Sequence, residues 1–198
     1  MSGPGPHPEP HADLATREPL LLTTDAVWIR IYRLTNAPIY FGRSSDNRFD
    51  APDSSYGVLY AATDSHGAFI ETFGLSTGIR VVTATALAER GRARLEASRP
   101  LTLINLFDTG GLARIGADAR LCSGDHSIAQ RWCAALKSHP SRPDGIYYPA
   151  RHDPPRAACA LFDHVAPTIT ATPLGRLDDP AHAGLLADIL ETYRFALL

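Results

Sequence analysis

Residues 58–75, VLYAATDSHGAFIETFGL, decide how the rest of this sequence is expected to fold. The first five residues form a short apolar run that is typical of a strand. Ala68, Phe69, Thr72 and Leu75 then follow at helical spacing. A residue at position 64 or 65, Asp or Ser, can cap the start of that helix. The pattern therefore predicts a strand, a tight turn and a helix.

The predicted helix carries one acid, Glu71. A carboxylate that a short apolar helix brings beside a strand end is placed to face a pocket. Charged helix positions more often face water, so a solvated surface glutamate is the alternative interpretation. The local pattern leaves both interpretations of Glu71 open.

Length and composition indicate one globular domain. The chain has 198 residues, of which 44% are hydrophobic and 8% aromatic, which is enough for one sizeable core. No apolar run reaches the roughly 18 to 20 residues of a membrane span, and the N-terminus lacks a secretory pattern. Three irregularly spaced cysteines favour reduced thiols. We therefore expect a soluble cytoplasmic protein that binds no membrane.

The basic residues are almost all arginines. Lys137 is the only lysine among 19 basic residues, and the formal net charge is -2. The planar fork of arginine suits phosphates and carboxylates, although coding preference explains such a bias as well. Because the chain has no basic block, we expect no direct binding of nucleic acid.

Taken in order, the chain begins with a proline-rich segment, residues 1–18, that we expect to form a disordered tail. The remaining residues, 19–198, are expected to form a single catalytic domain. The patterns predict strands at 27–33, 58–62, 81–84, 101–106, 145–148, 158–162 and 168–171, and helices at 126–138 and 185–195. An arginine-rich piece after residue 84 fits either a strand or a helix. Strands and helices do not alternate regularly, which favours an α+β fold over a doubly wound parallel sheet.

The predicted strand at 27–33 places an arginine among isoleucines. Its alternation puts Ile29, Ile31 and Arg33 on one face. An arginine on an apolar face needs an anionic partner, so Arg33 belongs either to a buried ion pair or to a ligand clamp. The next segment, residues 38–56, reads as a long loop that contains Arg48, and such loops are often functional.

Two apparent motifs near residue 125 do not form the sites they suggest. Asp125, His126 and Ser127 have the residue types of a hydrolase triad, but adjacent helix residues point about 100° apart and cannot form a relay. Cys122, His126 and Cys133 lack a fourth ligand and the usual zinc spacing, so we predict no metal site. The sequence also lacks a Walker loop and a dinucleotide-binding glycine fingerprint.

Five polar residues remain at the ends of predicted elements: Arg33, Arg48, Tyr60, Glu71 and Ser127. They suit a ligand that combines a diphosphate, a ring and a cationic sugar. Arginines can clamp the diphosphate, amides near Ser127 can add donors, Tyr60 can stack on a ring, and Glu71 can stabilise the cation.

The order of these residues resembles the RES domain family, bacterial proteins named for Arg, Glu and Ser, many of which are toxins that destroy NAD+. The likeness covers about residues 27–165. The segments that carry it are IYRL at 31–34, the loop 42–50 with NRFD at its end, GVLYAA at 57–62 with AFIET at 68–72, and GDHS at 124–127 leading to Trp132.

The resemblance implies a fold akin to ADP-ribosyltransferase toxins, a mixed split sheet with flanking helices and NAD+ bound in its cleft. It also implies cleavage of the nicotinamide–ribose bond, by water in an NAD+ glycohydrolase or by inorganic phosphate in an NAD+ phosphorylase. NAD+ would be the substrate, phosphate a co-substrate in the second case, and no further cofactor is implied. Toxins of this family are often encoded with a helix-turn-helix antitoxin, which would be the protein partner.

The resemblance gives each residue a role. Glu71 would act on the ribose hydroxyls and the cation, and Tyr60 would pack on nicotinamide or its ribose. Arg33 and Arg48 would take the diphosphate, or Arg48 an incoming phosphate, and Ser127 would hydrogen-bond a phosphate. Glu71, Arg33 and Ser127 are thus the predicted catalytic residues, and Arg33, Arg48, Tyr60 and Ser127 the predicted substrate-binding residues.

The sequence departs from many relatives after Tyr148-Pro149, where Ala150-Arg151 stands in place of Ser-Arg. We therefore take Ser127 as the family serine. Two other functions stay open from the sequence: an ADP-ribosyltransferase that modifies a protein, and a non-enzymatic interaction module whose arginines bind a partner surface. The acceptor, the antitoxin and a homo-oligomer also stay open.

Overall fold

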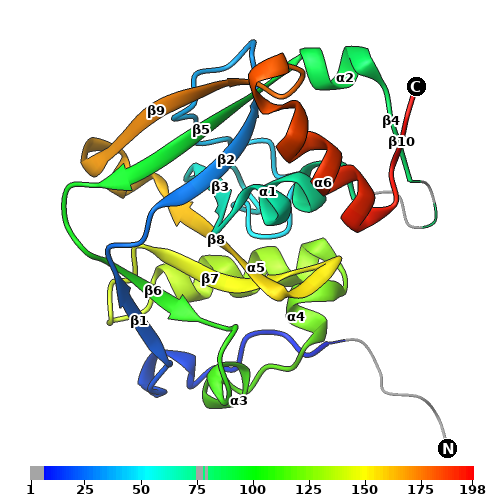
Figure 1. Ribbon diagram of the computed structural model, residues 1–198. Helices are drawn as coiled ribbons and strands as arrows, with labels where there is room; N and C mark the ends of the chain where they lie inside the picture. Colours follow the sequence, from blue (N-terminus) through cyan, green and yellow to red (C-terminus); the bar gives the residue numbers. More distant parts are fainter. Residues whose placement is uncertain (1–6, 75–77, 79) are drawn as a thin grey trace, which may run out of the picture.

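The computed structural model describes residues 7–74, 78 and 80–198, and one eight-stranded mixed sheet forms its centre (Figure 1). The strand order is β1-β6-β7-β8-β3-β2-β5-β9. The strands are β1 (Leu21–Thr24), β2 (Trp28–Arg33), β3 (Val58–Ala62), β5 (Arg90–Ala97), β6 (Leu101–Asn105), β7 (Gly145–Ala150), β8 (Asp153–Phe162) and β9 (Ile169–Arg176). Neighbouring strands pair antiparallel, except for the parallel pair of β6 and β7. A separate parallel pair joins β4 (Val81–Val82) to β10 (Ala196–Leu197).

Helices flank this sheet, which confirms the mixed fold with flanking helices. They are α1 (Ser65–Phe73), α2 (Ala84–Ala88), α3 (Gly111–Ile115), α4 (Arg120–Ser123), α5 (His126–Lys137) and α6 (Ala183–Tyr193), with 3-10 turns at Leu14–Thr16, Asp163–Thr168 and Pro180–His182. In Figure 1, α1 and α6 lie together near β2 and β3, and α5 runs along β7. None of the helices in the described ranges is long and apolar enough to cross a membrane.

The stretch that was expected to organise the fold does lie at its centre. Residues 58–62 form β3, and α1 follows after a tight turn. The Asp64 side chain caps α1 by accepting a hydrogen bond from the Gly67 N–H at 2.8 Å. Phe69 and Ile70 of α1 are fully buried. Leu75, the end of the predicted helix, lies outside the described residues.

The sheet is split beside this stretch. The register of β2 and β3 holds a single pair, Ile29 with Ala62, whereas β2 pairs with β5 and β3 pairs with β8 along their whole lengths. The two halves of the sheet therefore part just beyond Ile29. A split of this kind leaves backbone and side chains free to line a cleft.

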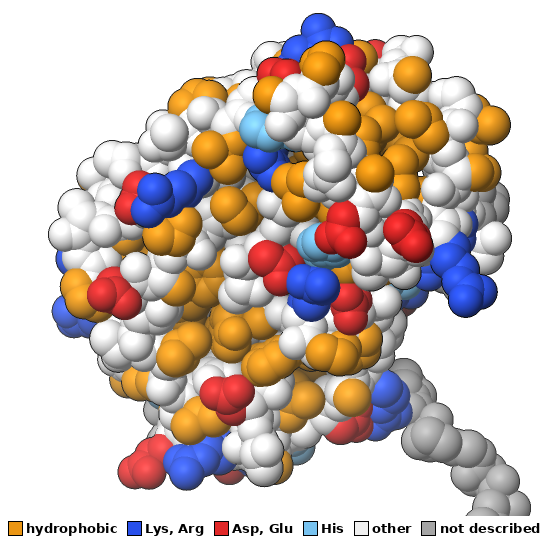
Figure 2. All heavy atoms as spheres, viewed as in Figure 1, with side chains coloured by type: hydrophobic (Ala, Val, Ile, Leu, Met, Phe, Trp, Pro, Cys, Tyr) orange, Lys and Arg blue, Asp and Glu red, His pale blue; other side chains and the backbone are white. Residues whose placement is uncertain are grey.

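Apolar clusters fill both faces of the sheet. One cluster joins α5 to β6 and β7, with Trp132 and Leu136 packed near Ile104 and Ile146. A second covers the opposite face, and a third fills the space between α1, α6 and α2. On the face seen in Figure 2, acidic and basic side chains are interspersed, so this surface shows no large patch of one sign.

The N-terminal segment differs from the expectation of a loose tail. Residues 1–6 lie outside the described part, but His7 and Leu14 are buried. The Trp132 indole Nε1 donates to the Pro8 carbonyl at 2.8 Å, and Glu9 forms an ion pair with Arg131. The low apolar content of residues 7–18 precludes a core of their own, yet a few anchors are enough to dock them on α5.

Other boundaries also differ from the predicted ones. The arginine-rich piece that fitted either a strand or a helix is β5. The strand predicted at 81–84 ends at Val82, because Thr83 caps α2 through its hydroxyl. The short strand β1 was not predicted, since its four residues show no alternation that sets them apart from a loop.

Candidate active site

A cavity of about 320 Å³ opens where β2 and β3 part. Residues of β2, β3, β5, α1, α4, α5, β7 and β8 line it, together with the loop before β3 and the turn after β7. Its volume is at the lower end of the range for small-molecule sites, about 300 to 1,000 Å³. The structure thus has a cavity in the split of the sheet, where a ligand site was expected.

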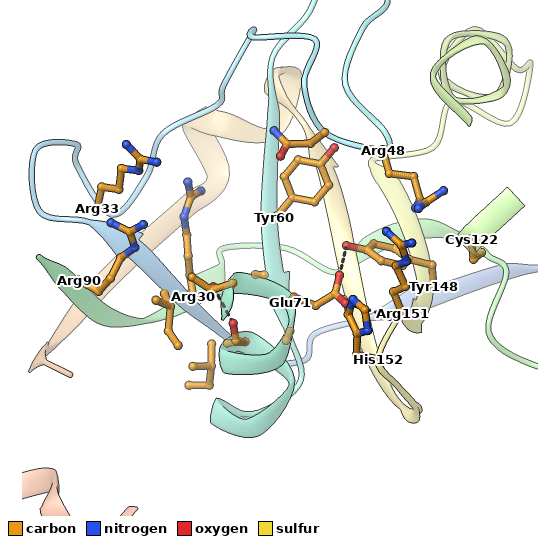
Figure 3. A pocket seen from close by; sticks show the side chains of 18 of the residues that line it. Arg30, Arg33, Arg48, Tyr60, Glu71, Arg90, Cys122, Tyr148, Arg151 and His152 are labelled. Carbon is orange, nitrogen blue, oxygen red and sulfur yellow. Dashed lines mark hydrogen bonds between the residues drawn. The ribbon is translucent and has the colours of Figure 1, made fainter. Parts of the chain in front are cut away.

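The cavity is strongly cationic. Among the described residues that line it, Glu71 is the only carboxylate, and five are arginines: Arg30, Arg33, Arg48, Arg90 and Arg151. In Figure 3, Arg33 and Arg90 lie at one end, and we call them the outer pair. Arg48 and Arg151 lie near Glu71 at the other end, and we call them the inner pair. Guanidinium groups gathered in this way suit phosphate or diphosphate ligands.

Glu71 lies in the cavity and is held from two sides. Its Oε1 accepts a hydrogen bond from the Arg151 backbone N–H at 2.9 Å, and its Oε2 accepts one from the Tyr148 hydroxyl at 3.5 Å. Burial raises the pKa of Glu71, while the Arg151 N–H and the charge of Arg48 oppose that rise. The carboxylate is therefore fixed in orientation and more basic than an exposed glutamate. Of the two interpretations of Glu71, the structure selects the one that faces a pocket.

Arg48 is a buried cation with spare hydrogen-bonding capacity. Its Nη1 donates to the Gly124 carbonyl at 2.8 Å, but its Nη2 is buried without a partner in the described part of the chain. Burial, and after it the charge of Arg151, lowers the pKa of Arg48. A buried guanidinium of this kind is costly unless an anion joins it. The two positive charges of the inner pair face only one carboxylate in the cavity, Glu71, so an anionic ligand can supply the negative charge that is missing.

Arg33 is exposed, so of its two interpretations the buried ion pair is wrong, and the ligand clamp stays a prediction. It shares a face with Ile29 and Ile31 as predicted, but it stands at the end of β2, where the sheet meets solvent. It forms no ion pair with any described residue. Its register partner is Arg90, whose pKa is lowered by partial burial and by the charge of Arg33. Two like charges side by side on a sheet repel each other, which favours an anion between them.

Tyr60 lines the cavity, and its hydroxyl is held by two hydrogen bonds to the loop before β3. The hydroxyl donates to Asp50 Oδ1 at 2.9 Å and accepts from the Phe49 N–H at 3.0 Å. Asp50 is fully buried and also binds the Asn47 backbone and side-chain amides. These bonds fix the loop that carries Arg48, which explains how a segment rich in Gly, Ser and Asp holds this arginine in place.

Ser127 does not line the cavity. Its hydroxyl donates to Asp125 Oδ1 at 2.6 Å, and Asp125 also caps α5 by accepting from the Ser127 N–H. The preceding residue, His126, is the one that reaches the cavity. The structure therefore brings together Arg33, Arg48, Tyr60 and Glu71 of the five predicted residues.

Sequence reasoning did not identify several residues of the cavity, namely Arg30, Arg90, Tyr148, Arg151 and His152. Arg90 was part of a piece whose secondary structure was undecided, and Tyr148 and Arg151 flank the position where the sequence departs from its relatives. Their number and type carried a weak signal, the excess of arginine over lysine. Arg30 is partly buried, and the loss of solvent around its guanidinium lowers its pKa to about 10, while its Nη1 has no partner among the described residues.

Metal-binding chemistry finds no support in the part of the chain that the structure describes, where no group of three or more His, Cys, Asp or Glu could hold an ion. Cys122 and Cys133 are buried free thiols, and burial raises the pKa of each to about 12. Such thiols are protonated and unreactive at neutral pH.

Comparison with known proteins places this site in a family. No curated protein matches the chain. Among solved structures, the fold is similar to a chain in the "Crystal structure of the M.tuberculosis MbcT-MbcA toxin-antitoxin complex", with a TM-score of 0.56 and 13% sequence identity over 85% of this chain and 91% of that chain. At this identity the likeness concerns the fold. The sequence model of the RES domain matches residues 27–180, which include β2, β3, α1, β5, β7 and every other element that lines the cavity. Because the match spans most of its length, the chain belongs to the RES domain family.

Proposed function

We propose that this protein cleaves the nicotinamide–ribose bond of NAD+, as an NAD+ glycohydrolase or an NAD+ phosphorylase, and that it acts as a toxin. One observation carries the proposal: a single oriented carboxylate, Glu71, lies in a cleft in which the other charged residues of the Asp, Glu, Lys and Arg types are all arginines. NAD+ joins an anionic diphosphate to a sugar that becomes cationic as nicotinamide leaves. The arginines of the cleft match the anionic diphosphate, and Glu71 matches the cationic sugar.

Glu71 would stabilise the transition state. Nicotinamide departs with the electron pair of its bond to C1 of the ribose, so positive charge develops on the sugar ring. A carboxylate fixed in advance by the Arg151 N–H and Tyr148 can stabilise that charge without reorganising. The ring of Tyr60 would pack on nicotinamide or its ribose.

The two arginine pairs would hold two different anionic groups. The outer pair, Arg33 and Arg90, would bind the diphosphate and leave the inner pair beside Glu71. In a phosphorylase, the inner pair would hold inorganic phosphate, whose oxygen bonds to C1 as nicotinamide leaves. A glycohydrolase uses no inorganic phosphate. The inner pair would then bind the phosphate of NAD+ that lies nearer to the nicotinamide ribose, and water would be the acceptor. Ser127 has no contact with the cavity, so neither version depends on it.

The products of the reaction distinguish these functions. Purified protein would be incubated with NAD+, with and without inorganic phosphate, and the products identified by chromatography and mass spectrometry. Free ADP-ribose would indicate hydrolysis, and phosphorylated ADP-ribose formed only with phosphate would indicate phosphorolysis. A protein that carries ADP-ribose would instead indicate a transferase. Intact NAD+ would refute the enzymatic proposal and leave an interaction module.

The toxin role is supported by the RES domain and by the fold shared with a chain of a toxin–antitoxin complex. Loss of NAD+ stops the dehydrogenases that depend on it, so expression of the chain should arrest a bacterium, and expression of Glu71→Gln should not. An antitoxin would be the protein partner that prevents this arrest. Soluble wild-type protein that leaves cellular NAD+ unchanged would contradict the toxin role.

A further inference from the structure

The backbone group that orients Glu71 comes from a tight turn. β7 and β8 are joined by Arg151 and His152, because Ala150 and Asp153 are register partners. The Arg151 N–H donates to Glu71 at 2.9 Å. A turn of two residues has few contacts of its own, so the position of this N–H depends on what fixes the strand ends beside it.

Four side chains fix the β8 end of this turn, and we call them the hairpin anchor: Asp64, Asp153, Arg156 and Tyr193. Asp153 Oδ2 accepts from the Tyr193 hydroxyl at 2.7 Å and from Arg156 Nε at 2.8 Å. Arg156 Nη1 also donates to Asp64 Oδ2, while the other oxygen of Asp64 caps α1. One network therefore joins the turn to the first turn of α1, the helix that carries Glu71.

The anchor also connects the active site to the C-terminal helix. Tyr193 is the last residue of α6, which lies beyond the residues 27–180 that match the RES domain. A second contact between α6 and α1, His66 with Asp188 at 3.1 Å, does not involve the turn. Among the described residues, α6 thus makes two polar contacts in this region, with His66 of α1 and with Asp153, and only the second reaches the turn that holds Glu71.

We propose that the hairpin anchor is a positioning device for Glu71, and that Tyr193 acts on the reaction through Asp153 and the Arg151 N–H. None of the four side chains lines the cavity, so none is a catalytic residue. The proposal rests on the role given to Glu71 above. Its structural part, that Tyr193 fixes the Arg151 N–H, can be measured without any activity.

The test compares Tyr193→Phe with the matched control Asp188→Asn. Phenylalanine keeps the ring that packs edge-on against His66 and removes only the hydroxyl. Because a misplacement of ~1 Å in an active site costs about a hundredfold in rate, a partly loosened turn should lower kcat about tenfold with little change in KM. Exchange of the Arg151 backbone amide, followed by NMR, should become about tenfold faster as the turn opens more often. The control should change neither quantity.

Three results would overturn the proposal. The first is a folded Tyr193→Phe protein with an unchanged kcat, and the second is an equal loss of kcat in Asp188→Asn, which would show that α6 acts only as general packing. The third is a lowered kcat without faster exchange, which would place Tyr193 elsewhere in the mechanism. If Tyr193→Phe does not fold, Asp153→Asn probes the same contact from the turn. Wild-type protein that leaves NAD+ intact would refute the proposed function, while the exchange comparison would still decide whether the anchor holds the turn.

Discussion

Glu71 illustrates how a single residue changes its meaning with its surroundings. On a helix surface it would be one of many solvated acids, but the Arg151 N–H and Tyr148 hold it inside a cleft. Burial raises its pKa above the ordinary value of 4.5, so the ionised form is less favourable in the folded than in the unfolded chain. Function and stability are therefore in conflict at this residue.

This conflict predicts that Glu71→Gln is at least as stable as the wild type at pH 7. A carboxyl whose pKa is raised on folding favours the folded state fully only below the unfolded pKa, and this contribution is lost as pH rises through the folded pKa. The amide oxygen of glutamine can still accept from the Arg151 N–H. Thermal unfolding at several pH values should show an advantage for the variant at pH 7 that shrinks as the pH falls toward about 4.5 and is absent below that pH. A variant that is clearly less stable at pH 7 would contradict the assigned surroundings.

Because Arg33 is exposed, the effect of Arg33→Ala on stability can be predicted separately from its effect on activity. Arg33→Ala removes no buried charge, so the free energy of unfolding should change by less than about 0.5 kcal/mol. If Arg33 binds the diphosphate, loss of a charge-assisted contact should weaken NAD+ use by about 1.5 kcal/mol or more, roughly tenfold in kcat/KM. Arg94→Ala is the control, since Arg94 is an exposed residue of β5 that pairs with Glu96 outside the cavity. Equal losses of activity in both variants would refute a specific role for Arg33.

At the scale of elements, the sequence predicted those helix caps and strands that depend on a few adjacent residues. The cap of α1 by Asp64, the cap of α5 by Asp125 and the apolar strand β3 all follow from a few adjacent residues. Pairing between distant segments decided the rest. Arg90 stands beside Arg33 only because β5 pairs with β2, and Arg151 reaches Glu71 only because β7 and β8 form a hairpin.

Ser127 is a residue at which the local pattern and the structure point in different directions, and its role stays a prediction. A serine in the first turn of a helix can donate to a ligand, but its hydroxyl also lies within reach of its own capping residue. Here it donates to Asp125 at 2.6 Å. Short side chains near a helix start often satisfy the backbone and the cap in this way.

The docked N-terminal segment gives a prediction for an element. Deleting residues 1–10 should lower the melting temperature and shift Trp132 emission to the red, because the Pro8 acceptor and the His7 ring that cover the indole are lost. NAD+ cleavage per folded molecule should remain, since the segment does not line the cavity. Glu9→Gln is the control: it removes only an exposed ion pair, which contributes little to stability. An unchanged melting temperature after the deletion would show that the segment contributes no stability.

At the scale of the whole molecule, the charge of the cleft contrasts with that of the chain. The protein carries a formal charge of -2, yet its cavity gathers five arginines around one acid. A cleft of one sign attracts an oppositely charged ligand, and salt screens that attraction over a Debye length of about 10 Å at 0.1 M. The arrangement therefore guides an anion to the site without making the whole protein basic.

This contrast predicts that kcat/KM for NAD+ falls severalfold as salt rises from about 0.01 to about 0.5 M, with a smaller change in kcat. The double variant Arg33→Ala/Arg90→Ala should show a shallower dependence, because it lacks both charges of the outer pair. Steady-state kinetics over a salt series checks both statements. Equal slopes for the two proteins would mean that the outer pair does not attract the substrate.

The most direct test of the central claim is the release of nicotinamide from NAD+ by purified protein, measured side by side for the wild type and Glu71→Gln. The account predicts steady release by the wild type and a loss of about a hundredfold or more in the variant, at an unchanged or higher melting temperature. NAD+ left intact by folded wild-type protein would contradict the account. Near-normal release by the folded Glu71→Gln variant would contradict it equally.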